Sequence, residues 1–309
     1  MPFHGLKTDL ELAFLVVSAG AVSYFISGQV LSNVLFTFLL ASLFFLVGLH
    51  LDLGFFKAIR NKSKQLSLAI LSVYVLVPAI AYIFSYIPSH IGDVFLVLGA
   101  SGAALGSPAI WSNLAKADGD LASYAGSFSV FGSLIFAPAL LLLFPLEVDY
   151  SLMIDNLVFA VIPFLIGVVT QSYENYLIED MRIHFSKLSF WLITVITFVQ
   201  ARLILQADGV IYTSQLFIAG LLFGAFSVLT FGYSHILGML SGFYEKEART
   251  IGFISSTRNV AIAFFIGAHV SPEVVLLVGL YYFVRQLMGV LFVDMYLHGE
   301  PKFIKRLGF

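Results

Sequence analysis

Long hydrophobic segments, separated by short polar turns, cover almost the whole chain. A helix needs about 20 apolar residues to cross the hydrocarbon layer of a bilayer. That length divides the 309 residues into ten predicted membrane-spanning helices. They are Glu11–Ser27, Val30–Leu51, Gln65–Tyr86, Asp93–Ala115, Leu121–Phe144, Leu152–Thr170, Phe185–Leu205, Gln215–Gly242, Arg249–Ala268 and Pro272–Leu297. The pattern therefore predicts an all-α integral membrane protein embedded in a lipid bilayer.

The composition supports this prediction. Hydrophobic residues make up 60% of the chain and charged residues 11%, with a mean hydropathy of +0.97. Soluble domains carry about 25% charged residues. The chain has no cysteine, which excludes a disulfide framework, a thiolate metal site and a cysteine nucleophile. We expect no cofactor, no resident metal and no nucleic-acid partner. The segment Met1–Asp9 lacks a small-residue cleavage site, so we expect the first hydrophobic segment to be retained.

Basic residues fall mainly on one side of this arrangement. Of the 16 Lys and Arg residues, 13 lie in turns and tails on one side. Arg202 ends a span on the opposite side, and Arg258 and Arg285 lie within spans. The 13 are Lys7, Lys57, Arg60, Lys62, Lys64, Lys116, Arg182, Lys187, Lys246, Arg249, Lys302, Lys305 and Arg306. The positive-inside rule therefore predicts a cell-membrane protein with both termini in the cytoplasm.

Five spans precede the break at Pro145–Ser151 and five follow it. An odd number per half places the halves in opposite orientations, as in inverted-repeat transporters. We therefore expect two inverted repeats, residues 1–148 and 149–309, that form one transport unit. In each half the fourth span is interrupted by small polar residues, at Gly99–Ile110 and at Ser255–Asn259. Pro108 disrupts the preceding helical turn. A simpler alternative is that these small residues only allow close helix packing.

The second interruption contains Arg258, whose charge would lie in the hydrocarbon region. Such a charge is costly unless the fold uses or neutralises it. Two broken helices would direct half-helix N-termini, near Ser107 and Asn259, toward the membrane midplane. Neutral donors and acceptors around them are Ser101, Ser107, Ser255, Ser256, Thr257 and Asn259. This combination predicts a binding site for a small organic anion with an apolar body, in which Arg258 anchors the charge.

Other polar residues fit either the same cavity or a structural role. Ser123 and Ser127 are four residues apart on the fifth span and could present one polar face to the cavity. Arg285 would extend an anion path or form a helix-packing hydrogen bond. Arg258 itself could be structural, held by backbone carbonyls freed at the break or by Asp155 or Asp294. We expect interfacial roles for His50 and Asp52, and a helix–helix hydrogen bond for His235.

Several short motifs resemble the bile acid:sodium symporter family. They are Phe44–Leu51 in the second span, Val77–Tyr82 in the third, Leu114–Lys116 with Asp120–Leu121 after the first break, and Arg249–Ile251 with Arg258–Asn259 in the second broken helix. The resemblance covers most of the chain. It implies a ten-helix secondary carrier whose broken fourth and ninth helices cross, with substrate and sodium bound between a panel and a core domain.

This chain departs from the family pattern at the positions that align with sodium ligands. Ile254 stands in place of an acidic residue and Arg258 in place of a glutamine. The amide of a Ser-Asn pair is replaced by Pro108, and the third-span glutamine by Val73. A fixed cation at Arg258 would also repel sodium. We therefore expect alternating-access transport that does not depend on the family's usual sodium sites.

Two other functions were compared with this hypothesis. The same fold serves cation/proton antiporters, which use carboxylates within the membrane, but neither predicted break contains Asp or Glu.

Gly99–Gly102, with Ser101, matches the nucleophile motif of rhomboid intramembrane serine proteases, and His235–Gly242 matches their histidine helix. A Ser–His dyad needs hydrogen-bond contact, and three predicted spans separate these motifs here. We therefore expect a carrier and not an enzyme.

Overall fold

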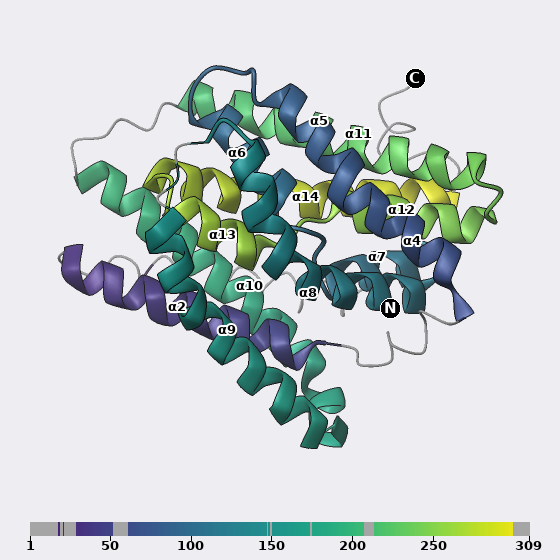
Figure 1. Ribbon diagram of the computed structural model, residues 1–309, viewed down its shortest axis with the longest axis horizontal. Helices are drawn as coiled ribbons and strands as arrows, with labels where there is room; N and C mark the ends of the chain where they lie inside the picture. Colours follow the sequence, from purple (N-terminus) through teal and green to yellow (C-terminus); the bar gives the residue numbers. More distant parts are fainter. Residues whose placement is uncertain are drawn as a thin grey trace.

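The computed structural model describes residues 18, 21, 29–51, 61–146, 148, 150–173, 175–206 and 213–298. Within these ranges the regular secondary structure is helical, and the one extended feature is a single isolated bridge between Ala103 and Arg258 (Figure 1). The predicted first span lies outside the described residues except for Ser18 and Ala21. The all-α prediction is confirmed.

Each of the other nine predicted spans corresponds to one helix, or to two or three consecutive helical segments, in the described part of the chain. The continuous ones are α2 (Gln29–Leu49), α8 (Gly119–Leu143), α9 (Tyr150–Tyr173), α10 (Asn175–Gln206), α11 (Thr213–Leu240) and α14 (Pro272–His298). The third span comprises α4 (Ser63–Leu71), the π-helical turn η1 (Ser72–Leu76) and α5 (Val77–Phe84). Four helices here are long and apolar enough to cross a membrane, and α8 would be a fifth if its two bent segments form one span.

The fourth and ninth spans are both broken, as predicted from their small polar residues. The fourth consists of α6 (His90–Ala100) and α7 (Ser107–Leu114), and the ninth of α12 (Glu245–Ser256) and α13 (Val260–Ala268). Pro108 lies in the first turn of α7, where its missing N–H costs no helical hydrogen bond. Because each half-helix is short, none of the four reaches across a bilayer alone.

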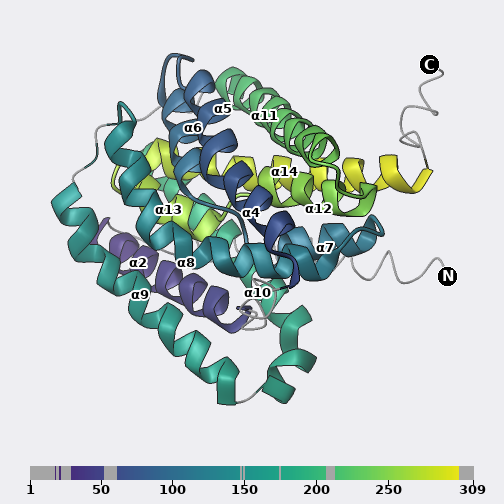
Figure 2. The same cartoon turned by 45° about the vertical axis from the view of Figure 1, so that its right-hand side comes forward.

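The helices form two groups. The first contains α2, α9 and α10, and the second contains α4 to α8 and α11 to α14; α10 also packs on α14 and so joins the two groups (Figures 1 and 2). Gly48 of α2 and Gly167 of α9 allow the closest approach in the first group. A Cβ on Gly48 would lie 2.2 Å from the Phe164 carbonyl oxygen, and one on Gly167 would lie 2.2 Å from that of Phe45. Small residues at such a crossing let two membrane helices pack backbone to backbone.

The second group is organised around the broken helices in a repeated way. Helix α8 of the first half packs on α12 of the second half, and α14 of the second half packs on α6 of the first half. Aromatic side chains fill the space among α5, α6, α11 and α14. Phe95 stacks edge-on against Phe223 with ring centroids 5.4 Å apart, and Phe223 against Tyr281 at 5.7 Å. This packing holds α6, the first part of the fourth span, against α11 and α14.

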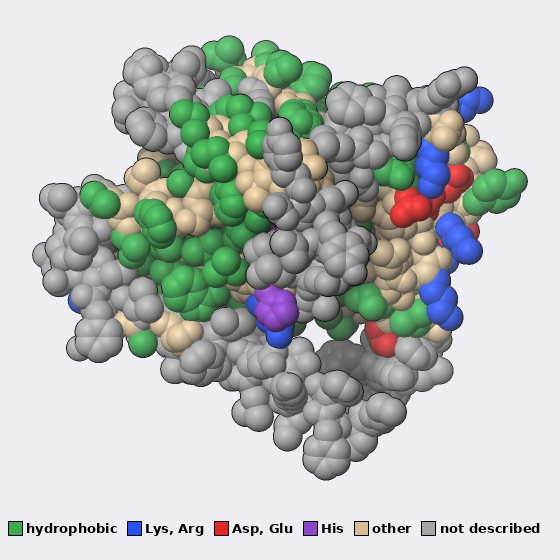
Figure 3. Space-filling view, turned by 90° about the horizontal axis from the view of Figure 1, so that it is seen from below, with side chains coloured by type: hydrophobic (Ala, Val, Ile, Leu, Met, Phe, Trp, Pro, Cys, Tyr) green, Lys and Arg blue, Asp and Glu red, His purple; other side chains and the backbone are tan. Residues whose placement is uncertain are grey.

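Charged side chains join helix ends that are distant in sequence. Lys62, before α4, pairs with Asp118, which begins α8. Gln65 donates to Glu247 of α12 over 2.8 Å, and Arg249 donates to the Ala115 carbonyl oxygen over 3.0 Å. Figure 3 shows charged side chains gathered along one edge of the molecule, beside a broad hydrophobic area. The turns before α4, α8 and α12, three of those that the charge pattern assigns to one side, therefore meet at one end of the described structure.

Candidate functional site

The two helix breaks cross and bond to each other through their backbones. The Ala104 N–H donates to the Thr257 carbonyl oxygen over 2.8 Å, and the Asn259 N–H to the Gly102 carbonyl oxygen over 3.0 Å. These bonds satisfy backbone groups that the interrupted helices leave free, which is a requirement in the membrane interior. Gly102 has a φ of +70°, and a Cβ there would lie 2.0 Å from the Ser133 hydroxyl oxygen. Glycine is needed at this turn.

Arg258 lies at the centre of the crossing, with 1% of its surface exposed. Its Nε donates to the Leu98 carbonyl oxygen over 2.8 Å, and its Nη2 to that of Gly99 over 3.0 Å. Both carbonyls belong to the last turn of α6, whose partial negative charge favours a cation. These are backbone carbonyls freed at the helix break, the partners that the structural alternative for Arg258 named. Its Nη1 has no hydrogen-bond partner among the described residues.

Arg285 brings a second buried guanidinium to the same crossing, with 3% exposure. Its Nη2 donates to the Thr257 hydroxyl oxygen, and its Nη1 to the Gln286 side-chain oxygen over 3.4 Å. Its Cζ lies 5.6 Å from the centroid of the Trp111 ring. Within the described residues neither Arg258 nor Arg285 forms an ion pair with a carboxylate. The crossing therefore carries two positive charges without a protein counter-ion from the described part of the chain.

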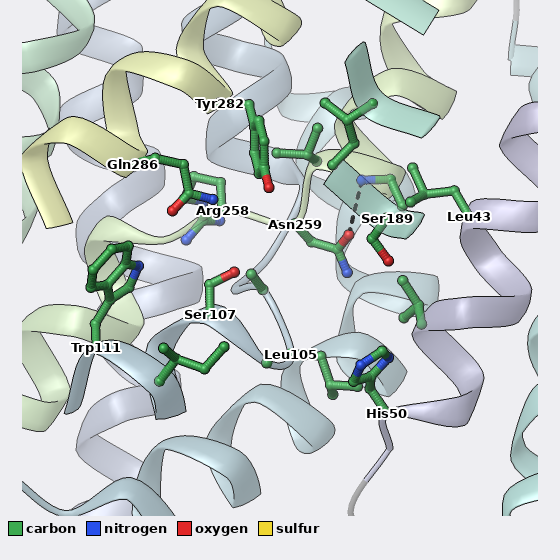
Figure 4. A pocket seen from close by; sticks show the side chains of 17 residues that line it. Leu43, His50, Leu105, Ser107, Trp111, Ser189, Arg258, Asn259, Tyr282 and Gln286 are labelled. Atoms are coloured by element: carbon green, nitrogen blue, oxygen red, sulfur yellow. Dashed lines mark hydrogen bonds between the residues drawn. The ribbon is translucent and has the colours of Figure 1, made fainter. Parts of the chain in front are cut away.

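A cavity of about 250 Å³ opens beside this crossing. Helices α2 and α10 line one side, and α7, α13, α14 and the two breaks line the other. The cavity thus lies between the two helix groups. Its walls combine apolar side chains such as Leu43 and Leu105 with the polar groups of Ser107, Asn259 and Gln286 (Figure 4).

Two helices begin at this cavity. Helix α7 starts at Ser107, and α13 starts directly after Asn259, as expected from the sequence. The Asn259 Oδ1 accepts from the backbone N–H groups of Ala261 and Ile262, at 3.1 and 3.3 Å, and so caps α13. Its Nδ2 is buried without a partner among the described residues. The positive ends of two helix dipoles and an unused amide donor favour a negatively charged ligand.

The cavity contains three of the ten predicted site residues, namely Ser107, Arg258 and Asn259. The lining does not include the other seven, which are Ser101, Ser123, Ser127, Ser255, Ser256, Thr257 and Arg285. Ser101 donates to the Leu98 carbonyl oxygen over 2.9 Å, and Thr257 to that of Phe253 over 2.6 Å. Hydroxyl groups in helices commonly bond to the preceding turn in this way, which keeps these two away from the cavity.

Five polar or aromatic lining residues were not predicted as site residues. They are His50, Trp111, Ser189, Tyr282 and Gln286. His50 was expected at the interface, but its ring lies at the cavity and its Nδ1 is 2.8 Å from the Leu46 carbonyl oxygen. Gln286 follows Arg285 directly, and Trp111 lies four residues after Ser107. Both residues are close in sequence to predicted site residues, and this proximity could have identified them.

The structure gives no support to the two competing functions. Ser101 bonds to the Leu98 carbonyl, whereas the His235 Nε2 lies 3.4 Å from Glu245 Oε1, so these residues do not form a dyad. The residues that line the cavity include no Asp or Glu for proton–cation exchange. Across the described ranges, no group of three or more His, Asp or Glu residues could hold a metal ion.

A comparison with models of known protein families finds a match. The model of the Sodium Bile acid symporter family matches residues 37–208, which is more than half of the chain. A search of curated proteins finds no significant match. The matched region begins within α2, includes the first broken helix, and extends through α10. This chain therefore belongs to the sodium bile acid symporter family, whose members are transporters.

Proposed function

We propose that this protein is a secondary carrier that moves a small organic anion by alternating access. The observation that carries the proposal is the pair of buried guanidinium groups, Arg258 and Arg285, beside a cavity and without a carboxylate partner in the described residues. Removing a charge from water costs several kcal/mol unless an opposite charge or good hydrogen bonds compensate. An anion in the cavity would supply the missing negative charge.

The protein dipoles only partly offset these charges. The C-terminal carbonyls of α6 favour the Arg258 cation, but the N-termini of α7 and α13 add positive potential on the cavity side. Arg285 is bonded to a hydroxyl and an amide, both of which are neutral. The net positive electrostatic potential at the cavity therefore favours an anion over a neutral or cationic substrate. Leu43, Leu105 and other apolar walls suit an apolar body attached to the charged group.

The position of the cavity supports alternating access. Movement of α2, α9 and α10 relative to the remaining helices would expose the crossing to one side of the membrane and then to the other. We assign these two groups as the panel and the core domain. The matched contacts of α8 on α12 and of α14 on α6 support two inverted repeats, residues 1–148 and 149–309, within one transport unit.

We further propose that transport is independent of the family's usual sodium sites. Sodium binds protein oxygens, and the Leu98 and Gly99 carbonyl oxygens at the crossing already accept bonds from Arg258. The fixed guanidinium therefore takes the place of a mobile cation and would repel a second one. At the aligned positions, Ile254 and Val73 supply no side-chain oxygen.

The charge distribution supports a cell-membrane protein with both termini in the cytoplasm. The basic residues Lys62, Lys116, Lys246 and Arg249 all lie near the end where α4 and α12 begin and α7 terminates. The positive-inside rule assigns this end to the cytoplasm.

A ligand screen on the detergent-purified protein tests the proposed substrate charge. Ligands that bind the native state raise its melting temperature. A suitable panel contains organic anions together with amines and neutral amides of the same carbon skeletons. We expect the anions, and not the matched amines or amides, to raise the melting temperature. Stabilisation by the amines alone would contradict the proposal.

A further inference from the structure

Trp111 presents an unused hydrogen-bond donor at the cavity. Its indole Nε1 is buried and has no hydrogen-bond partner in the described part of the chain. Among the residues that line the cavity, three have a buried side-chain polar atom without such a partner: Trp111 Nε1, Arg258 Nη1 and Asn259 Nδ2. All three are N–H donors. Within the described lining, no buried side-chain acceptor lacks a partner, so the cavity suits a ligand with acceptor groups.

The indole is held in a defined orientation. The Arg285 guanidinium faces the ring, with Cζ 5.6 Å from its centroid. On α14, Gly289 leaves room for the ring, because a Cβ there would lie 2.6 Å from Trp111 Cε2. Arg285 is itself bonded to Thr257 and Gln286. A donor fixed by such contacts is pre-organised for binding and loses little freedom when a ligand arrives.

Trp111 and Asn259 face the cavity from different places. In Figure 4 the Trp111 nitrogen lies on the side of the ring that faces Arg258 and Ser107, whereas Asn259 lies farther across the cavity. Trp111 belongs to α7 and Asn259 caps α13, so the two donors come from the two broken helices. A single carboxylate accepts bonds through two oxygens on one carbon. Donors spread in this way fit a ligand whose acceptors are also spread.

We propose that Trp111 donates a hydrogen bond to a second oxygen of the transported anion and so determines specificity. The substrate class is then a short carboxylic acid with another acceptor a few carbons away, which is a hydroxyl, an oxo group or a second carboxylate. This inference rests on the proposed anion carrier and adds the recognition of a second group. The volume of about 250 Å³ lies below the roughly 300–1,000 Å³ of pockets for drug-sized ligands, so the carbon skeleton is short.

The free-energy cost of leaving a buried donor unpaired explains how Trp111 would select among anions. A ligand that fills the cavity without an acceptor near Trp111 leaves the indole N–H buried and unpaired in the complex. A site built to donate to a substrate oxygen discriminates strongly against an analogue that lacks it. We therefore expect four-carbon acids with a second acceptor to bind about tenfold or more tightly than butyrate, which has none.

The two tryptophans of the chain allow a direct test. The chain contains 2 Trp residues, and Trp191 forms a hydrogen bond to the Ser18 hydroxyl at 3.0 Å and is not part of the cavity lining. Trp191→Phe therefore leaves Trp111 as the sole indole fluorophore. The probes are 4-hydroxybutyrate, 4-oxobutyrate, succinate and butyrate, titrated into the purified variant up to about 10 mM. We expect at least one of the first three to change Trp111 emission and to bind about tenfold or more tightly than butyrate.

Calorimetry on Trp111→Phe completes the experiment. This variant keeps an aromatic ring without the N–H, and we expect it to lose the preference for acids that carry a second acceptor. Trp191→Phe is the matched control and should keep the preference. Comparing the ligands on Trp191→Phe needs no change at Trp111, so the test remains decisive if Trp111→Phe fails to fold.

The possible outcomes distinguish a failure of the proposed role of Trp111 from a failure of the proposed anion carrier. Equal affinity for butyrate and the three other acids would overturn the role of Trp111 but leave an anion site. If none of these acids binds and a larger anion such as taurocholate does, the short-substrate class is wrong and the anion carrier stands. Binding of butylamine in the absence of binding by any acid would overturn both proposals.

Discussion

Ala103 and Arg258 form an isolated antiparallel bridge between the two helix breaks. The bridge joins a residue of the first half of the chain to one of the second half, at the point where both broken helices lose their internal hydrogen bonds. It brings the Arg258 side chain to the last carbonyls of α6. The two halves therefore meet through backbone pairing, and that pairing sets the position of the buried charge.

The orientation of the protein can be tested at the two ends of one continuous helical segment. Lys64, near the start of α4, and Tyr86, just after α5, are both exposed. Single cysteines placed there in this cysteine-free chain should react differently with an impermeant maleimide. We expect labelling at position 86 and none at position 64 in sealed cells, because the basic end lies in the cytoplasm. The reverse pattern would show that the topology is inverted.

Transport should not require sodium. We expect uptake of an anion identified by thermal shift to be the same, within about twofold, in proteoliposomes with sodium or potassium buffer. The physical reason is that Arg258 already occupies the carbonyl oxygens of Leu98 and Gly99. A large stimulation by sodium alone would show that other oxygen atoms form a cation site and that the guanidinium does not replace it.

Tyr74 is predicted to stabilise the first helix break. The π-helical turn η1 carries it, and its hydroxyl lies 3.2 Å from the Ser129 Oγ and 3.1 Å from the Ser133 Oγ. Ser129 in turn accepts the Ala103 N–H over 2.7 Å. Tyr74→Phe should therefore lower the free energy of unfolding by about 1–3 kcal/mol, since it leaves buried polar groups less well bonded.

The matched control for Tyr74→Phe is Tyr82→Phe. The Tyr82 side chain is 39% exposed, and its hydroxyl bonds to that of Tyr86, so its loss should change stability by less than about 0.5 kcal/mol. Melting temperatures of the two variants in the same detergent make the comparison. Equal melting temperatures would mean that the Tyr74 hydroxyl does not support the break.

The position of both helix breaks was predictable from local sequence. Pro108 and the small residues around Gly102 interrupt one hydrophobic run, and the polar residues before Asn259 interrupt the other. The backbone-carbonyl partners of Arg258 were also among the predicted alternatives. These features depend on the chemistry of a few neighbouring residues, which a single sequence displays.

The cavity lining was less predictable because it depends on how distant helices pack. Ser189 and Gln286 reach the cavity through the rotation of α10 and α14 about their own axes, which hydrophobicity does not determine in helices that are apolar all round. Ser101 looked similar to Ser107, but its hydroxyl bonds to its own helix while Ser107 lines the cavity. Residue type alone could not separate these two serines.

Arg258 is proposed to bind the charge of the transported anion. In the structure it also braces α6, so substitution should affect both stability and binding. We expect Arg258→Gln to lower the melting temperature moderately, because bonds to Leu98 and Gly99 are lost. Loss of the charge partner should weaken anion binding by about 2–5 kcal/mol, or between one and four decades in affinity. Arg258→Lys should restore only part of this affinity, because a point charge cannot reproduce the planar fork.

The most direct measurement is anion affinity by calorimetry on Arg258→Gln that elutes as a single monodisperse peak, compared with Arg258→Lys and the unmodified protein. The ligand is the anion that most raises the melting temperature of the unmodified protein. We expect affinity to fall in the order Arg, Lys, Gln at position 258. Unchanged affinity in the folded Gln variant would contradict it and would leave Arg258 with a purely structural role.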